Sequence, residues 1–283
     1  MMSDKDSPKT WEQSVQWLRN QPDKVQLVAD CYYDDPLHGA AERFWSSEEW
    51  KAVQVLLDGR KGVALDVGAG RGIASYALAK DGFSVIALEP NPSSLVGATA
   101  INSLAIETNT DIQVCEEFSE RLPFEDNSFD VVYARAVLHH TKNLKSACSE
   151  FQRVLKPGGV MLAVREHVIS KKADLQLFFN NHPLHHLYGG ENAFLLKEYE
   201  TAIRQAGFTD IQLISPWRSP INFAPHTIDS LKNRISYRFG FLDSFVLRLL
   251  NVPSIWKLVL NLLSVSDRRP GRLYSFLAHK TLI

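Results

Sequence analysis

The sequence predicts an α/β fold built on a mostly parallel sheet, and three observations indicate it. First, a short, almost continuously apolar run from Val63 to Val67 leads into a loop with glycine at positions 68, 70 and 72. Such a run is typical of a parallel strand covered on both faces. Second, expected strands and helices alternate from residue 61 onward, which favours right-handed βαβ units. Third, 283 residues with 45% hydrophobic content can fill a sizeable core.

The elements follow from this pattern in order. Helices are expected first, at 11–20, 22–31 and 39–57, where Pro22 suits a first helical turn and Gly59 follows the last one. The alternating part predicts strands at 62–67, 83–89, 111–115, 129–133 and 159–166, with helices at 71–80, 92–105 and 143–155. A helix at 195–206 and strands at 208–214 and 273–278 come later, separated by insertions at 167–194 and 216–270.

Composition excludes several classes of protein. The formal net charge of -1 gives no electrostatic footprint for a polyanion, so nucleic acid is not expected as the partner. Three cysteines without a C-x-x-C pair suggest neither a disulfide framework nor a zinc ribbon. The first ten residues lack the apolar core of a signal peptide and are expected to form a disordered tail, which favours a cytoplasmic protein.

The glycine loop has the features of a ligand site. Three glycines in five residues let the backbone turn sharply and leave its N–H groups open at the start of a helix. Asp66 lies at the carboxyl end of the strand, the edge where open α/β sheets bind ligands. Glu89 ends the next strand about twenty residues on, where a carboxylate can accept hydrogen bonds from both hydroxyls of a ribose.

The spacing Asp66-x-Gly68-x-Gly70-x-Gly72 resembles the first motif of the class I S-adenosylmethionine-dependent methyltransferases, in particular the methyltransferase type 11-like domain. It differs from the dinucleotide fingerprint, because Ile73 stands where that fingerprint has its third glycine. Further segments resemble the same family in the same order along the chain, namely Leu122–Phe124, Asn127–Asp130, Leu138–His140 and Phe151–Leu162.

The resemblance implies a doubly wound, Rossmann-like, seven-stranded sheet whose last strand enters antiparallel between the fifth and sixth. It divides the chain into an N-terminal tail and helical cap (1–58), a cofactor-binding core (59–166), and acceptor-side insertions with the last strands of the same sheet (167–283). The implied cofactor is S-adenosylmethionine. The residues expected to bind it are Asp66, Gly68, Ala69, Gly70, Gly72, Glu89, Pro90, Phe118, Ser119 and Arg135.

One position departs from the family pattern. The family often places an aspartate after the third strand to bind the adenine amino group, and Phe118 stands at that place. Phe118 could stack on the adenine with polar contacts from the backbone near Ser119, or Glu117 could reach in. The sequence leaves these alternatives open.

The catalytic candidates are few because the sulfonium already activates the methyl group, so the protein mainly aligns the acceptor and excludes water. His139 and His167 are candidate general bases or substrate-orienting groups near the methyl. The segment His182–His186 holds three histidines without a carboxylate at ligand spacing, so no metal is expected. Pocket lining or a polar loop are its other interpretations, and Gly189 and Gly190 could hinge a lid.

The resulting prediction is methyl transfer to a small or lipophilic acceptor that the sequence does not name. The alternatives are an NAD(P)-dependent oxidoreductase and a non-catalytic S-adenosylmethionine-binding module. Tyr76 and Lys80 match the Tyr-x-x-x-Lys pair of short-chain dehydrogenases, but on the helix after the glycine loop rather than after a later strand. A monomer or homodimer is expected.

Two apolar regions remain to be placed. Phe44, Trp45 and Trp50 could pack on the sheet or form a lid. Residues 242–265 carry an apolar stripe at helical spacing. Burial on the protein or in a dimer is favoured for this stripe over a membrane surface, and we expect the segment to roof the acceptor pocket, with Trp256 contributing to acceptor binding.

Overall fold

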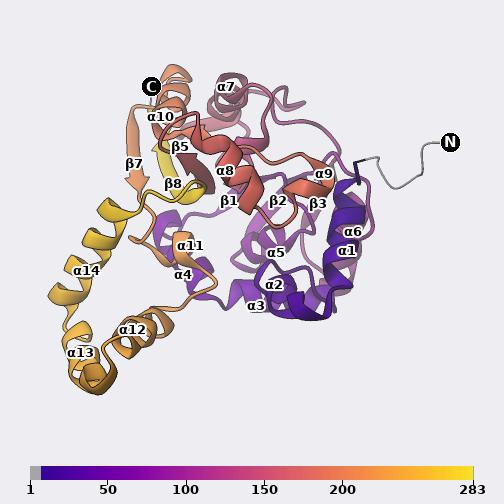
Figure 1. The fold of residues 1–283 in the computed structure, drawn as a ribbon. Helices are drawn as coiled ribbons and strands as arrows, with labels where there is room; N and C mark the ends of the chain where they lie inside the picture. The colour runs from indigo at the N-terminus through magenta and orange to yellow at the C-terminus, as the bar shows by residue number, and fades with distance from the viewer. Residues whose placement is uncertain (1–7, 283) are drawn as a thin grey trace.

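The computed structural model of the chain describes residues 8–282, so residues 1–7 of the expected N-terminal tail lie outside the described residues. Its centre is a twisted sheet (Figure 1). The strand order is β3-β2-β1-β4-β5-β8-β7, and a two-residue strand, β6, pairs with β5. The strands are β1 (Gly62–Val67), β2 (Phe83–Leu88), β3 (Ile112–Cys115), β4 (Phe129–Arg135), β5 (Leu155–Ile169), β6 (Phe194–Leu195), β7 (Asp210–Ile214) and β8 (Arg272–His279).

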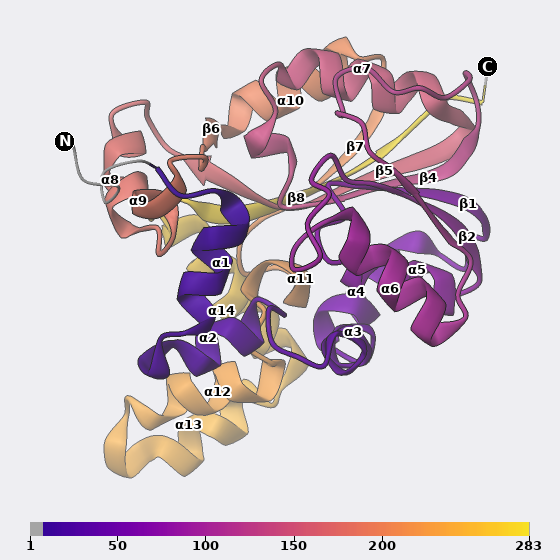
Figure 2. The same ribbon diagram turned by 90° about the vertical axis from the view of Figure 1, so that its right-hand side faces the viewer.

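The helices cover both faces of this sheet (Figure 2). One face carries α3 (Leu37–Trp45), α4 (Glu48–Leu57), α5 (Ile73–Lys80) and α6 (Ala98–Thr108), and the other carries α7 (Leu144–Val154) and α10 (Leu196–Gln205). The N-terminal helices are α1 (Trp11–Arg19), the 3-10 turn η1 (Pro22–Lys24) and α2 (Val25–Asp30). Two short helices, α8 (Asp174–Asn181) and α9 (His185–Tyr188), follow β5, and the 3-10 turn η2 (Leu138–His140) follows β4. The doubly wound α/β fold is therefore confirmed.

The strand β8 confirms the expected reversal in the sheet. It lies between β5 and β7 and runs antiparallel to both, with Leu162 opposite Leu277 on one side and Leu213 opposite Phe276 on the other. The other main strands pair in parallel. The sheet has eight strands where seven were expected, because Phe194 and Leu195 pair with the far end of the long strand β5.

Two helix predictions need correction. The helix expected over 39–57 is two helices, since the chain breaks at Ser46 and Ser47. The hydroxyl of Ser47 accepts a hydrogen bond from the Trp50 N–H, so Ser47 caps a new helix start. The helix expected from residue 92 begins at Ala98, because Asn91 and Ser93 cap the backbone of a turn with their side chains.

The aromatic residues before the sheet are mostly core residues. Phe44 and Trp50 are fully buried in a cluster that includes the β1, β2 and β4 side chains facing these helices. The indoles of Trp45 and Trp50 both donate to the carboxylate of Asp81. None of the three lines the main cavity, which favours the core interpretation over a lid.

The short helix α11 (Pro220–Phe223) packs on the body of the fold, against α4, β5 and β8, and Ile221 is fully buried there. After it, residues 228–266 form a helical arm of α12 (Ile228–Tyr237), the 3-10 turn η3 (Gly240–Leu242), α13 (Asp243–Leu250) and α14 (Pro253–Ser266). Its inner side has a small core of Phe223, Leu231, Leu250 and Trp256. Within residues 8–282, no single helix has the length and hydropathy to cross a membrane. The consecutive segments Gly240–Leu250 and Pro253–Ser266 have the required length and hydropathy only when they are taken together, and the chain bends by 109° between them.

Candidate active site

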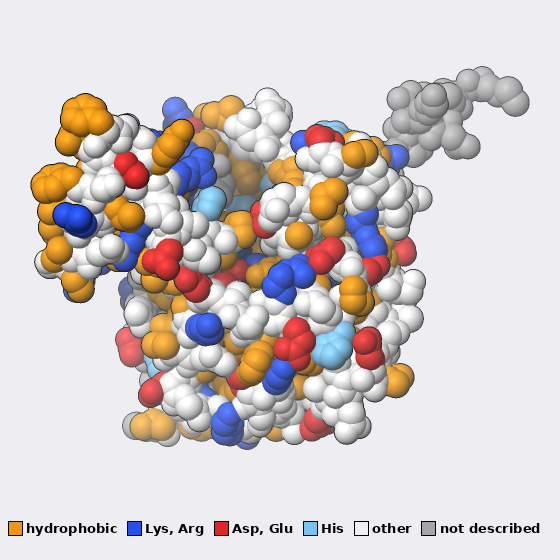
Figure 3. Space-filling view, turned by 90° about the horizontal axis from the view of Figure 1, so that it is seen from below, with side chains coloured by type: hydrophobic (Ala, Val, Ile, Leu, Met, Phe, Trp, Pro, Cys, Tyr) orange, Lys and Arg blue, Asp and Glu red, His pale blue; other side chains and the backbone are white. Residues whose placement is uncertain are grey.

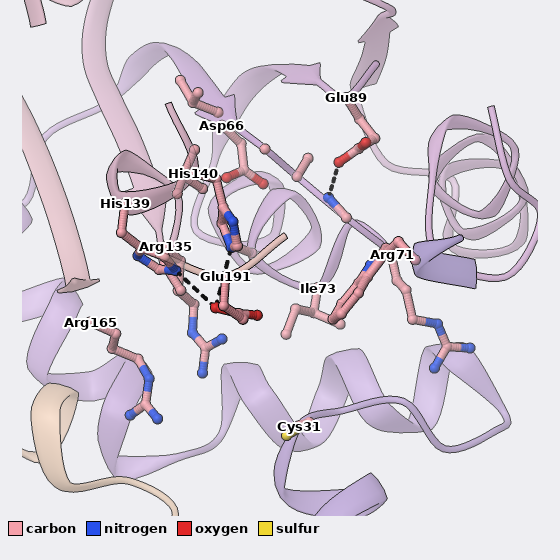
Figure 4. A pocket seen from close by; sticks show the side chains of 18 of the residues that line it. Cys31, Asp66, Arg71, Ile73, Glu89, Arg135, His139, His140, Arg165 and Glu191 are labelled. Carbon is pink, nitrogen blue, oxygen red and sulfur yellow. Dashed lines mark hydrogen bonds and ion pairs between the residues drawn. The ribbon is translucent and has the colours of Figure 1, made fainter. Parts of the chain in front are cut away.

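A cavity of about 540 Å³ lies at the carboxyl ends of the parallel strands. Its walls come from the glycine loop, the ends of β2, β4 and β5, the N-terminal helices and residues 182–191 (Figure 4). Of the expected site residues, it is lined by Asp66, Gly68, Ala69, Gly70, Glu89, Pro90, Phe118, Ser119, Arg135, His139 and His167. The structure thus brings together every expected site residue except Gly72.

Glu89 holds the glycine loop in place. Its carboxylate accepts hydrogen bonds from the N–H of Gly70 at 2.8 Å and from the N–H of Asn91 at 3.0 Å. Burial raises the pKa of this carboxyl, whereas the two backbone bonds act in the opposite direction. Each carboxylate oxygen has a further lone pair, so Glu89 can still accept the ribose hydroxyls of a nucleoside while it fixes the loop.

Asp66 is buried beneath the same loop. Its carboxylate accepts a hydrogen bond of 2.6 Å from the Ser75 hydroxyl at the start of α5. Burial raises the pKa of Asp66 to about 7, and the nearby Glu89 adds to this shift. A cationic ligand group in the cavity would reverse the shift by favouring the charged carboxylate.

The glycines of the loop have different tasks. Gly70 has a φ of +58°, and a Cβ placed on it would meet open space, so its missing side chain leaves room in the cavity. A Cβ on Gly68 would lie 2.7 Å from Val137, and one on Gly72 would lie 3.2 Å from Ile101. Gly68 therefore permits close approach of the loop after β4, and Gly72 permits packing against α6.

Phe118 lies at the mouth of the cavity. Its side chain is 63% exposed, and its ring faces the Lys142 ammonium at 5.9 Å. Ser119 is buried beside it, and Glu117 also lines the cavity. Which of them contacts an adenine stays a prediction.

A buried ionic cluster forms the floor opposite the loop. Arg135 donates two hydrogen bonds to the carboxylate of Glu49, at 2.7 and 3.0 Å, and Arg165 lies 3.7 Å from the same carboxylate. Although burial opposes ionisation, the two guanidinium groups hold the pKa of Glu49 below its usual range. Glu49 thus fixes Arg135, which was expected to bind cofactor (Figure 4). Arg165 also lines the cavity, and its Nη1 donates to the carbonyl oxygens of Ile221 and Ala224.

His139 is fully buried and oriented by Glu166. Its Nδ1 lies 2.7 Å from Oε2 of Glu166, and this carboxylate also accepts the backbone N–H groups of residues 137, 138 and 139. A carboxylate that accepts three N–H bonds is an acceptor toward Nδ1 as well, so Nδ1 carries the proton and Nε2 is the free lone pair. Burial, followed by the neighbouring histidines, holds the pKa of His139 well below its usual range.

His167 is oriented in the same way. Its Nδ1 donates to the carbonyl oxygen of Gly271 at 3.0 Å, because a carbonyl can only accept. Burial is the main cause that lowers the pKa of His167 to about 3. His139 and His167 therefore both present neutral Nε2 atoms, with their ring centroids 4.6 Å apart.

Several site residues were missed from the sequence. They are Glu49, Arg165, Glu166 and Glu191, and no shared sequence motif marks them. Glu191 follows the Gly189–Gly190 pair and is 7% exposed. It supplies the carboxylate that the histidine segment lacks in sequence, since its oxygens lie 3.7 Å from His139 and 3.6 Å from His182. The one available signal is that Glu166 directly precedes His167 at the end of a predicted strand.

The arm does not meet its expected role as a roof. No residue from 216 to 270 lines the cavity, whereas α1, α2 and the 182–191 segment do. The physical reason is that α12 to α14 pack on one another and extend away from the sheet (Figure 1). The acceptor side is covered instead by Trp11, Leu18, Leu27 and Leu184.

The chain is similar in sequence to known methyltransferases. A family model described as a methyltransferase domain matches residues 65–163. The demethylmenaquinone methyltransferase of Chlorobaculum tepidum is 30% identical over 64% of this chain and 74% of its own length. The sterol 4-C-methyltransferase of Caenorhabditis elegans is 31% identical over 48% of this chain and 42% of its own length.

Solved structures share the fold. The phosphoethanolamine N-methyltransferase 2 of Haemonchus contortus, solved with S-adenosyl-L-methionine, superposes with a TM-score of 0.52 at 20% identity, over 90% of this chain and 59% of its own. A [4+2]-cyclase superposes with a TM-score of 0.53 at 18% identity, over 82% and 81% of the two chains. The glycine loop, the strand order and the relatives agree, and the chain belongs to the class I S-adenosylmethionine-dependent methyltransferases.

Proposed function

We propose that this enzyme transfers the methyl group of S-adenosylmethionine to a small lipophilic acceptor, with the cofactor on the Glu89 side of the cavity. The observation that carries the proposal is one continuous cavity with two different ends. The first end has the backbone N–H groups of the glycine loop and the carboxylates of Asp66 and Glu89. The second end combines apolar walls with a few buried polar groups.

The second end fits a mostly apolar acceptor that has a polar head. Trp11, Leu18, Leu27 and Leu184 supply apolar surface, whereas His139, His167 and Arg165 line the cavity at the strand ends. Sites for small molecules usually combine an apolar wall with a small number of placed polar groups. The relatives named for demethylmenaquinone and sterol substrates support an acceptor of this kind.

The geometry supports a role for each of the cofactor residues. Glu89 accepts ribose hydroxyls, Asp66 faces the cationic end of the cofactor, and the loop backbone at Ala69 and Gly70 contacts the ligand. His139 and His167 line the acceptor end and orient the polar head of the acceptor. The N-terminal helices exclude water from the methyl group.

The test separates methyl transfer from the two alternatives. The full chain is incubated with methyl-labelled S-adenosylmethionine and a panel of quinols, sterols and small polar amines, and thermal unfolding is followed with S-adenosylhomocysteine and with NAD. We expect stabilisation by S-adenosylhomocysteine alone and label transfer to a lipophilic acceptor. Stabilisation by NAD would instead support the oxidoreductase, and cofactor binding without transfer to any acceptor would support the binding module.

A matched pair of glycine variants locates the cofactor in this assay. Gly70→Val places a branched side chain in the cavity, and Gly59→Val imposes similar backbone strain at a φ of +69° away from it. We expect Gly70→Val to lose S-adenosylhomocysteine binding at least about a hundredfold, since backbone approach to the ligand is blocked. Gly59→Val should bind within about twofold of wild type. Equal binding by both variants would contradict the loop assignment.

A further inference from the structure

The buried histidines surround a carboxylate oxygen that has no hydrogen-bond partner. Oε2 of Glu191 is buried and unpartnered, although its other oxygen accepts from the Tyr188 hydroxyl. Nε2 of His139 lies 3.7 Å from Oε2, and Nε2 of His140 lies 3.9 Å from it. Leaving a buried carboxylate oxygen unpaired is costly, so this position calls for a partner that the described side chains do not supply.

The ring protons of His139 and His167 point away from Oε2 of Glu191. Nδ1 of His139 donates to Glu166, and Nδ1 of His167 donates to the Gly271 carbonyl. Both rings therefore direct Nε2 lone pairs, not protons, toward the same space. Acceptor atoms that converge in this way are satisfied by a cation. In metal sites, ligating histidines donate their other ring N–H to a carboxylate or a backbone carbonyl, as these two do.

We propose that His139, His167 and Glu191 bind a divalent transition-metal ion through Nε2, Nε2 and Oε2. Among residues 8–282 these three form the group of ligand atoms found close enough to share an ion, all within 4.8 Å of one another. Ligand atoms of a tetrahedral ion with bonds near 2.0–2.1 Å lie roughly 3.4 Å apart. The ligand atoms of His139, His167 and Glu191 therefore need to move only slightly closer together to bind the ion.

The donor set selects the class of metal. Two imidazoles and one carboxylate suit zinc, iron(II) or cobalt(II), whereas magnesium prefers oxygen ligands and water. Three protein ligands leave a position open, and here it opens toward the acceptor end of the cavity, which His139, His167 and Glu191 all line. A hydroxyl or carbonyl oxygen of the acceptor can take that position and be polarised there. This assignment departs from the expectation that no metal is bound.

The metal proposal is tested by metal content, without any assay of activity. Tag-free full-length protein is stripped with a chelator, incubated with Zn²⁺, Co²⁺ or Mg²⁺, desalted and analysed by elemental mass spectrometry. We expect about one Zn²⁺ or Co²⁺ per chain, visible Co²⁺ absorption and no retained Mg²⁺. Glu191→Gln and His167→Gln should retain less than about a fifth of this amount, because each removes one of three ligands.

The control is His186→Gln, since His186 belongs to the same segment but is exposed and does not line the cavity. It should retain metal like wild type. Circular dichroism and S-adenosylhomocysteine binding confirm that each variant folds. The proposal would be overturned if the wild-type protein retained no Zn²⁺ or Co²⁺, or if folded ligand variants retained the wild-type amount. If a ligand variant fails to fold, the metal content of the wild-type protein still decides the test.

A second, independent observation concerns the outer surface of the arm. Of seventeen large hydrophobic side chains that are exposed among the described residues, ten lie between residues 237 and 265. They are Tyr237, Phe239, Phe241, Leu242, Phe245, Leu249, Val252, Leu258, Leu262 and Val265. Figure 3 shows hydrophobic side chains gathered on the lobe that projects at the left. An apolar surface of this extent marks an interaction site.

Charge identifies the partner. Residues 228–270 contain seven Lys and Arg but only three Asp, a formal charge of +4, although the whole chain has a net charge of -1. Arg248 and Lys257 are exposed on the same helices as the apolar side chains, whereas the exposed Arg234 and Arg238 line a second cavity beside Phe223 and Leu231. A second copy of the arm would bring two surfaces of equal positive charge together, whereas anionic headgroups complement them. We infer that the arm binds the surface of an anionic membrane, with Phe241 and Phe245 inserted between the headgroups.

Vesicle flotation of the full chain tests this inference separately from the metal and from methyl transfer. We expect binding to vesicles with anionic lipid, at least about fivefold weaker binding to neutral vesicles, and further weakening by salt. Phe241→Asp should reduce binding at least about fivefold, whereas Ile106→Asp, an 83% exposed position on α6, should not. No flotation of wild type, equal flotation of Phe241→Asp, or a dimer in solution that Phe241→Asp dissociates would overturn it.

Discussion

The two ends of the cavity are built differently. The end with the glycine loop comes from one continuous stretch, since Asp66, Gly70 and Glu89 lie within 24 residues and Glu89 bonds directly to the loop backbone. The opposite end joins Glu49, Arg135, Arg165, His167 and Glu191 from four distant segments. A cofactor shared by a family needs one fixed geometry, and a local loop provides it. The acceptor end depends on tertiary contacts, so it can change without disturbing the loop.

The largest effect should come from the buried ionic cluster at the acceptor end. Glu49→Gln leaves the guanidinium groups of Arg135 and Arg165 buried without a counter-charge, so we expect the free energy of unfolding to fall by about 3 to 5 kcal/mol. Denaturant titration measures this. Asp126→Asn, which breaks an ion pair with Arg153 at a 68% exposed carboxylate, should cost less than about 1 kcal/mol. Similar losses of unfolding free energy in Glu49→Gln and Asp126→Asn would contradict the special importance of the buried ionic cluster.

The next effect depends on pH and lies under the glycine loop. The pKa of Asp66 is raised from 3.8 to about 7 by burial, so the folded protein without cofactor holds one proton more than the unfolded chain between these values. The Asp66 contribution therefore lowers stability as pH rises from about 4 to about 7, by up to about 4 kcal/mol in total. Asp66→Asn should lack this loss, so its stability relative to wild type should increase with pH. A constant difference from about pH 4 to about pH 8 would contradict the assigned shift.

A smaller effect tests how the loop binds its ligand. Glu89→Ala removes the acceptor for the Gly70 and Asn91 N–H groups as well as the expected acceptor for the ribose. We expect affinity for S-adenosylhomocysteine to fall at least about tenfold in calorimetry, because charge-assisted hydrogen bonds contribute about 1.5 to 3 kcal/mol. Glu116→Ala, exposed and outside the cavity, serves as the control. Unchanged affinity in folded Glu89→Ala would remove this residue from the cofactor site.

The smallest effect concerns the arm. Since Trp256 packs against Leu231 and Leu250 and does not line the cavity, Trp256→Ala should leave cofactor affinity and the KM for a water-soluble acceptor within about twofold. Steady-state kinetics measures both. A selective rise in the KM of such an acceptor would show that the arm roofs the pocket after all.

Local patterns account for what the sequence could predict. The strand, the glycine loop and Glu89 follow from apolar runs and glycine spacing over a few residues, and the antiparallel place of β8 followed from the family resemblance. The break at Ser46 and Ser47 was missed because the apolar periodicity continues through it. Only one hydrogen bond, from the Trp50 N–H to the Ser47 hydroxyl, marks the start of the second helix. Glu49 and Glu191 could not be found, because burial of an acid beside Arg135 or His139 is visible only after distant segments pack.

The position of β8 has a consequence for how the molecule is made. Residues 215–271 separate β7 from β8, and β7 pairs only with β8 among the described strands. During synthesis the apolar edge of β5 stays open until residues 272–279 emerge, and such an edge readily pairs with other chains. His167 also obtains its Gly271 partner only then. The nascent chain can therefore complete its cofactor loop well before its acceptor side, and a ribosome-bound chain is most prone to aggregate in that interval.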